Sequence, residues 1–198
     1  MPILILNMSG NLKGFEDQLC LDLSARINDQ TTIITRRGEN LLSERSVLGG
    51  DPYGVVVIVA HGCSLENSTT RVNIGLQPQN DQIGIERVLN TPTILTQILG
   101  RNPIPYVLVY CSCEALSIET FNSGIADPNC LGVVASREEI GFRDIGLFAD
   151  IVNYLNMYLS RNVFDTQQFY SIVRNLSEQH GDFPLVRFLE VARVQIEE

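Results

Sequence analysis

The stretch Val-Val-Val-Ile-Val-Ala-His-Gly, residues 55–62, decides how this chain folds. Its first five residues are all β-branched, and such side chains favour the extended backbone of a strand. A strand without polar alternation is typical of a parallel sheet that helices cover on both faces. The run ends at His61 and Gly62, and open α/β sheets bind their ligands beyond the carboxyl ends of such strands. The stretch therefore predicts an α/β fold with a candidate functional residue, His61, at one sheet edge.

Strands and helices are expected to alternate along most of the chain. The predicted strands are 3–7, 31–35, 55–60, 104–110 and 131–135. The predicted helices are 12–27, a short one within 39–51, 91–99, 114–121, 142–159, one capped by Asp165 or Thr166 that reaches 177, and 183–194. Thr91-Pro92 is typical of a helix start and Gly100 of a helix end. The polar stretch 63–90 is irregular, with room for a small hairpin.

This alternation predicts one domain over residues 1–198, with its core in about 3–159 and helices in about 160–198. The fold class is α/β, with three layers and a mainly parallel sheet that has helices on both faces. Net charge is −9 and there is no basic block, so nucleic acid is not an expected partner. No apolar run approaches the roughly 20 residues that span a membrane. Five cysteines, an odd number, favour a reducing cytoplasmic location over a disulfide framework.

His61 and Cys113 are the candidate catalytic pair. Each follows a predicted buried strand, and if those strands are neighbours, both residues emerge at the same sheet edge. A cysteine needs a nearby base because its thiol is mostly protonated at neutral pH, and an imidazole can fill that role and then protonate a leaving amine. The backbone N–H groups of Gly62 and Cys113 could bind the oxyanion of a tetrahedral intermediate.

These motifs resemble the caspase-like (clan CD) cysteine peptidases: caspases, metacaspases and, most closely, the bacterial CHAT peptidases. The shared pattern is an apolar strand that ends in His-Gly, then a second apolar strand that ends in a small residue and the nucleophilic cysteine. Here these are His61-Gly62 and Ser112-Cys113, 52 positions apart, and in caspases the histidine lies about 50 residues upstream. The opening strand and the Val133-Val134-Ala135-Ser136 segment before a long helix are similar too.

The resemblance implies a three-layer caspase-like fold and a cysteine endopeptidase that needs no cofactor or metal. Its substrate would be a protein, and an activating protein partner would control it, as in bacterial effectors of antiviral defence or regulated cell death. By analogy with caspases, Arg36, Arg37 and Arg137 are candidates for a substrate pocket that holds an acidic residue. The acidic net charge points instead to basic substrates, and Cys111 replaces the aspartate with which metacaspases bind them.

Several alternatives remain open on the sequence alone. Cys111 lies two residues before Cys113, so both share one face of an extended strand and either could be the nucleophile. Both could equally be buried core cysteines, or join His61 and Cys63 in a zinc site. His180 is interpreted as a helix C-terminal residue. For the whole chain, the alternatives are an inactive caspase-like interaction module and an unrelated flavodoxin-like binding domain.

Overall fold

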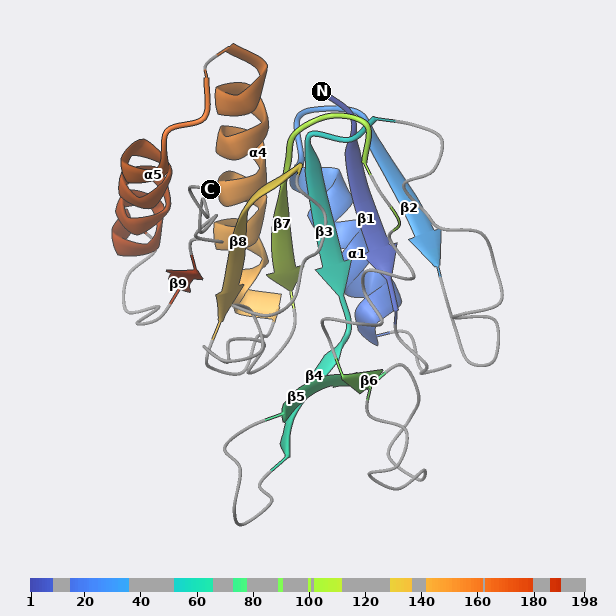
Figure 1. Ribbon diagram of the computed structural model, residues 1–198. Helices are drawn as coiled ribbons and strands as arrows, with labels where there is room; N and C mark the ends of the chain where they lie inside the picture. Colours follow the sequence, from blue (N-terminus) through green and yellow to red (C-terminus); the bar gives the residue numbers. More distant parts are fainter. Residues whose placement is uncertain are drawn as a thin grey trace.

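A computed structural model shows the arrangement of the helices and strands (Figure 1). The residues that it describes are 1–8, 15–35, 52–65, 73–77, 89–90, 100, 102–111, 129–136, 142–161, 163–179 and 186–189.

A six-stranded sheet forms the centre of the fold, in the order β2-β1-β3-β7-β8-β9 (Figure 1). Its first five strands are parallel and its last is antiparallel. The bounds of these strands are β1 Ile3–Asn7, β2 Thr31–Thr35, β3 Val55–Val59, β7 Tyr106–Cys111, β8 Cys130–Ser136 and β9 Val186–Leu189. The five parallel strands confirm the strands predicted from apolar, β-branched runs, with ends that differ by at most two residues.

Both faces of the central strands are buried, which gives the fold its three layers. Every residue of β1, β3 and β7 is buried, although successive side chains point to opposite faces. On one face, side chains such as Ile5, Val57 and Val109 join the main hydrophobic core. On the other face, neighbours such as Leu6 and Ile58 are just as inaccessible. The predicted α/β fold with a mainly parallel, doubly covered sheet is therefore confirmed.

Three described helices lie on the face that carries the main core: α1 (Phe15–Arg26), α4 (Ile145–Arg161) and α5 (Thr166–Gln179). A short 3-10 turn, η3 (Phe142–Asp144), precedes α4. Helix α4 lies between α1 and α5 and contributes Phe148, Ile151 and Leu155 to the core (Figure 1). The helices predicted within 39–51, 91–99 and 114–121 lie outside the described residues. Gly100, the predicted end of one of them, has a φ of 70°, which is the left-handed conformation that suits a helix C-cap.

A predicted helix start and a predicted apolar helix face can be compared with the structure. The backbone N–H of Gln168 donates a 2.7 Å hydrogen bond to Asp165 Oδ1, so Asp165 is the N-cap of α5. In α1, the predicted apolar face is confirmed by the burial of Leu19 and Leu23, with Ile27 directly after the helix.

The predicted helix 183–194 is wrong over residues 186–189, which form β9. This strand pairs with β8, so that Val134 lies opposite Phe188 and Ser136 opposite Val186. Without β9, the backbone N–H and C=O groups along that edge of β8 would lack a strand partner. Pairing with the sheet therefore outweighs the helical pattern of the local sequence.

A second, antiparallel sheet contains β4 (His61–Leu65), β5 (Asn73–Gln77) and β6 (Leu89–Asn90). It extends beyond the carboxyl ends of the main-sheet strands (Figure 1). The pairing of β4 with β5 confirms the small hairpin expected within 63–90, and it starts two residues earlier, at His61.

Candidate active site

Three central strands end level with one another at the carboxyl edge of the main sheet. In the strand register, Asn7 at the end of β1 pairs with Val59 at the end of β3, and Val59 pairs with Cys111 at the end of β7. The backbone N–H of Met8 donates a 2.8 Å hydrogen bond to the Val59 carbonyl, which continues the β1–β3 pairing by one residue. The backbone at this edge is therefore fixed by hydrogen bonds between strands rather than by loop conformation. We call the paired ends of β1, β3 and β7 the platform.

His61 and Gly62 leave this platform directly from β3. Ala60 is buried, and His61 begins β4, where it lies opposite Gln77 of β5. Gly62 follows in the same strand, opposite Leu76. The sequence prediction placed His61 just after a buried strand, and the structure adds that the chain continues from it into a second strand. The backbone at positions 61 and 62 is thus held by pairing with β5, directly after the main-sheet strand β3 ends.

Cys113 lies outside the described residues, but Cys111, two residues before it at the end of β7, is described. Val59 and Cys111 are paired across adjacent parallel strands, and positions 61 and 113 each follow that pair by two residues. Neighbouring strands lie about 4.8 Å apart, so both segments begin within one strand spacing of each other. The prediction that the two strands are neighbours, with their carboxyl ends at one edge, is confirmed.

The alternative nucleophile Cys111 is a core residue. It is only 2% exposed, and it belongs to the hydrophobic cluster on the α1 and α4 face of the sheet. A thiol buried in apolar surroundings is poorly reactive, because the thiolate is disfavoured there.

The same placement disfavours Cys111 as a zinc ligand. Within the part of the chain that the structure describes, no three His, Cys, Asp or Glu residues gather as a metal site. That part excludes Cys113 and the side chains of His61 and Cys63, so the zinc alternative is not tested for these residues.

The three candidate substrate-binding arginines lie outside the described residues, but the strands that precede them in the chain are described. Arg137 directly follows β8, which is next to β7. Arg36 and Arg37 follow β2, which is three strands from β7. That separation is about 14 Å at the usual strand spacing. Of the two strands that precede these arginines, β8 is therefore the direct neighbour of β7 and β2 is not. His180 also lies outside the described residues.

One polar pair at this edge was not singled out from the sequence. Asn7 is 1% exposed, and its Nδ2 donates a 2.6 Å hydrogen bond to Asp17 Oδ1 in α1. The bond ties the start of α1 to the end of β1, next to the position from which His61 leaves β3. The sequence feature that could have revealed this pair is an asparagine at the end of an otherwise apolar strand. A buried polar side chain there must find a hydrogen-bond partner.

Tyr110 precedes Cys111 in β7 and lies fully buried on the opposite face of the sheet. Burial raises the pKa of its phenol well above the usual value, and charge repulsion from Cys130 raises it further. Tyr110 therefore stays neutral over the physiological range, so it is a core group rather than a candidate base.

No protein-family model and no curated protein matches this chain. In the described part of the chain, no helix is long and apolar enough to cross a membrane.

Proposed function

We propose that this protein is a cysteine endopeptidase, with Cys113 as the nucleophile and His61 as the general base. The observation that carries the proposal is the register of β3 and β7, in which Val59 pairs with Cys111, so that His61 and Cys113 each follow by two residues. The burial of Cys111 in the core supports Cys113 over Cys111. The proposed site lies at the edge where open α/β sheets bind their ligands.

In the proposed reaction, the Cys113 thiolate attacks the carbonyl carbon of a peptide bond, and His61 holds the proton taken from the thiol. The backbone N–H groups of Gly62 and Cys113 bind the oxyanion of the tetrahedral intermediate. His61 then gives its proton to the leaving amine, which departs and leaves a thioester on Cys113. Water attacks the thioester, His61 accepts its proton, and the release of a carboxylic acid regenerates the thiol.

The proposal includes a protein substrate, a reducing cytoplasmic environment and an activating protein partner, as in the bacterial defence effectors that the sequence resembles. Arg137 is the first residue to test for substrate specificity because β8 lies beside β7.

The test is intact-mass spectrometry after treatment with a peptidyl thiol electrophile. The wild-type protein should gain one adduct, which the Cys113→Ala variant should not form. The His61→Ala variant should label about a hundredfold or more slowly, since a general base contributes roughly 10²–10⁴ in rate. Cys111→Ala is the matched control and should label like the wild type if it folds. Labelling of Cys111 and Cys113 at equal rates that do not depend on His61 would refute the proposed pair.

A second candidate function is a flavodoxin-like ligand-binding domain. The parallel strands run in the order β2-β1-β3-β7-β8, and this 2-1-3-4-5 order is that of the flavodoxin type, with the ligand at the β1/β3 switch point. The same edge would then bind a nucleotide or flavin. Denaturing the purified protein and identifying any released ligand by mass spectrometry and absorbance separates the candidates, because a stoichiometric nucleotide or flavin favours this one.

A further inference from the structure

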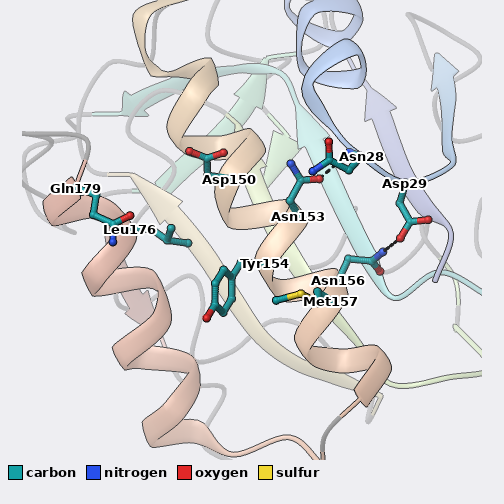
Figure 2. Close-up of a pocket in the computed structure, with 9 residues that line it drawn as sticks. All are labelled: Asn28, Asp29, Asp150, Asn153, Tyr154, Asn156, Met157, Leu176 and Gln179. Atoms are coloured by element: carbon teal, nitrogen blue, oxygen red, sulfur yellow. Dashed lines mark hydrogen bonds between the residues drawn. The ribbon is translucent and has the colours of Figure 1, made fainter.

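A pocket of about 520 Å³ opens on the outer side of α4 (Figure 2). Its floor is α4 itself, which contributes Asp150, Tyr154 and Met157 among others. One wall is the turn between α1 and β2, and the other is the last part of α5, where Leu176 and Gln179 lie (Figure 2). The volume is in the range of specific binding sites, roughly 300–1,000 Å³.

The wall formed by the α1–β2 turn is held in place by hydrogen bonds. Asn153 accepts a 2.8 Å bond from the backbone N–H of Asn28 and donates a 3.1 Å bond to the carbonyl of Arg26. Asn156 Nδ2 donates a 2.6 Å bond to Asp29 Oδ2 (Figure 2). Two side chains of α4 thus fix the turn, so this part of the pocket is formed before any ligand arrives. Preformed sites lose less entropy when they bind.

The pocket combines an apolar surface with carboxylates. Tyr154 is 44% exposed and Met157 is 41% exposed, although both are large hydrophobic residues, and Leu176 faces them from α5. Asp150 lies one helical turn before Tyr154 and is exposed at one end of the pocket (Figure 2). Asp29 adds a second carboxylate, and the chain's amino group lies 3.7 Å from its Oδ2. Among the described residues that line the pocket, no side chain is basic.

We propose that this pocket binds a basic, amphipathic segment of a partner protein. A lysine or arginine of the segment pairs with Asp150, and an arginine can also stack on the Tyr154 ring. Apolar side chains of the same segment cover Met157 and Leu176. The choice of occupant follows from charge complementarity, because a cation with an apolar neighbour matches both parts of the lining. Exposed aromatic and methionine side chains are also typical of the centres of protein interfaces.

The wall formed by the α1–β2 turn lies toward the amino edge of the sheet, away from the proposed active site. Asn28 and Asp29 come just before β2, and β2 begins beside the first residue of β1. His61 follows β3 at the opposite, carboxyl edge, and β7, the strand that leads to Cys113, ends at that same edge. A segment bound here leaves the proposed active site open, so the inference does not depend on the peptidase proposal.

The test is a selection from a random 16-residue peptide library against the folded protein, followed by affinity measurements by fluorescence anisotropy. We expect the selected peptides to combine lysine or arginine with aliphatic residues. Tyr154→Ala and Asp150→Asn should each weaken their binding about tenfold or more. Asp22→Asn and Val163→Ala remove an acidic and an apolar side chain outside the pocket, and they should bind as the wild type does. Circular dichroism and thermal melting confirm that each variant is folded.

Other results would overturn the proposal. Selection of acidic or uncharged peptides, or binding that both pocket variants leave unchanged, would show that this surface does not recognise a basic segment. A selection that yields no binding peptide would show the same. If N-acetyl-arginine amide binds as tightly as the peptides, the pocket is a site for a small organic cation instead. Labelling at Cys113 reports separately on the proposed peptidase.

Discussion

At the scale of single residues, Asn7 shows how a buried polar side chain can fix the geometry of a sheet edge. Its hydrogen bond to Asp17 joins α1 to the end of β1. We expect Asn7→Ala to lower the free energy of unfolding by about 2 kcal/mol, because a hydrogen bond to a charged group contributes roughly 1.5–3 kcal/mol. Urea unfolding measures the change. Gln18→Ala is the matched control, because it removes an exposed bond of the same 2.6 Å length to Asp22. Its effect should be within about 0.5 kcal/mol of zero, and equal losses in both variants would contradict the special role of Asn7.

Tyr110 should make the stability of the protein depend on alkaline pH. Because its pKa is raised in the folded state, the folded protein keeps the phenol proton above about pH 10, where the unfolded chain releases it. The contribution of Tyr110 to the free energy of unfolding is therefore complete below pH 10. As the pH rises further this contribution is lost, by up to about 1.4 kcal/mol per pH unit. Tyr110→Phe lacks this group, so the wild type should lose stability relative to the variant between pH 9 and pH 11. Urea unfolding at a series of pH values checks this, and parallel curves would contradict it.

At the scale of elements, a glycine sets how closely α5 approaches β8. A Cβ added to Gly132 would lie 3.2 Å from two ring carbons of Phe169, which is 1% exposed. The ring also packs against Phe164, with 5.4 Å between the ring centres. Since the buried ring has little space to move, we expect Gly132→Ala to cost about 1–3 kcal/mol in unfolding free energy.

A double-mutant cycle separates this contact from a general effect of alanine on the strand. In the Phe169→Leu background the smaller side chain leaves room for the new methyl group, so Gly132→Ala should cost less there than in the wild type. A coupling energy of at least about 0.5 kcal/mol is expected from residues in contact. If the two changes are simply additive, the clash does not determine the cost.

The same scale shows what the sequence could predict and what it could not. The strands 3–7, 31–35 and 55–60 were predictable because β-branched runs have a strong local preference. The Asp165 cap was predictable because capping depends on neighbouring residues. β9 was predicted as a helix because its partner, β8, is about 50 residues away and local sequence does not encode that pairing. The Asn7–Asp17 bond and the pocket on α4 likewise depend on which elements pack together.

At the scale of the whole molecule, the common edge at which β3 and β7 end was predictable, but the surroundings of that edge were not. His61 and Cys113 were placed at one edge because parallel strands present their carboxyl ends together. The structure pairs Val59 with Cys111, so the strands that lead to His61 and Cys113 end level with each other. The burial of Cys111 on the α1 and α4 face depends on which residues of β7 point to that face. A shift of the strand by one residue would move each side chain to the other face.

The antiparallel strand β9 forms one edge of the main sheet and covers β8, and this makes the state of association a test of the fold. A chain that ends at Gln179 loses β9 and leaves the edge of β8 without that partner. Exposed edges pair readily with other chains, so this truncation should associate as protein concentration rises. A chain that ends at Glu190 keeps β9 and is the matched control, and it should behave like the full chain. Light scattering coupled to size-exclusion chromatography measures both. If the shorter truncation behaves like the control at every concentration, protection of the β8 edge by β9 is not needed to keep the molecules apart.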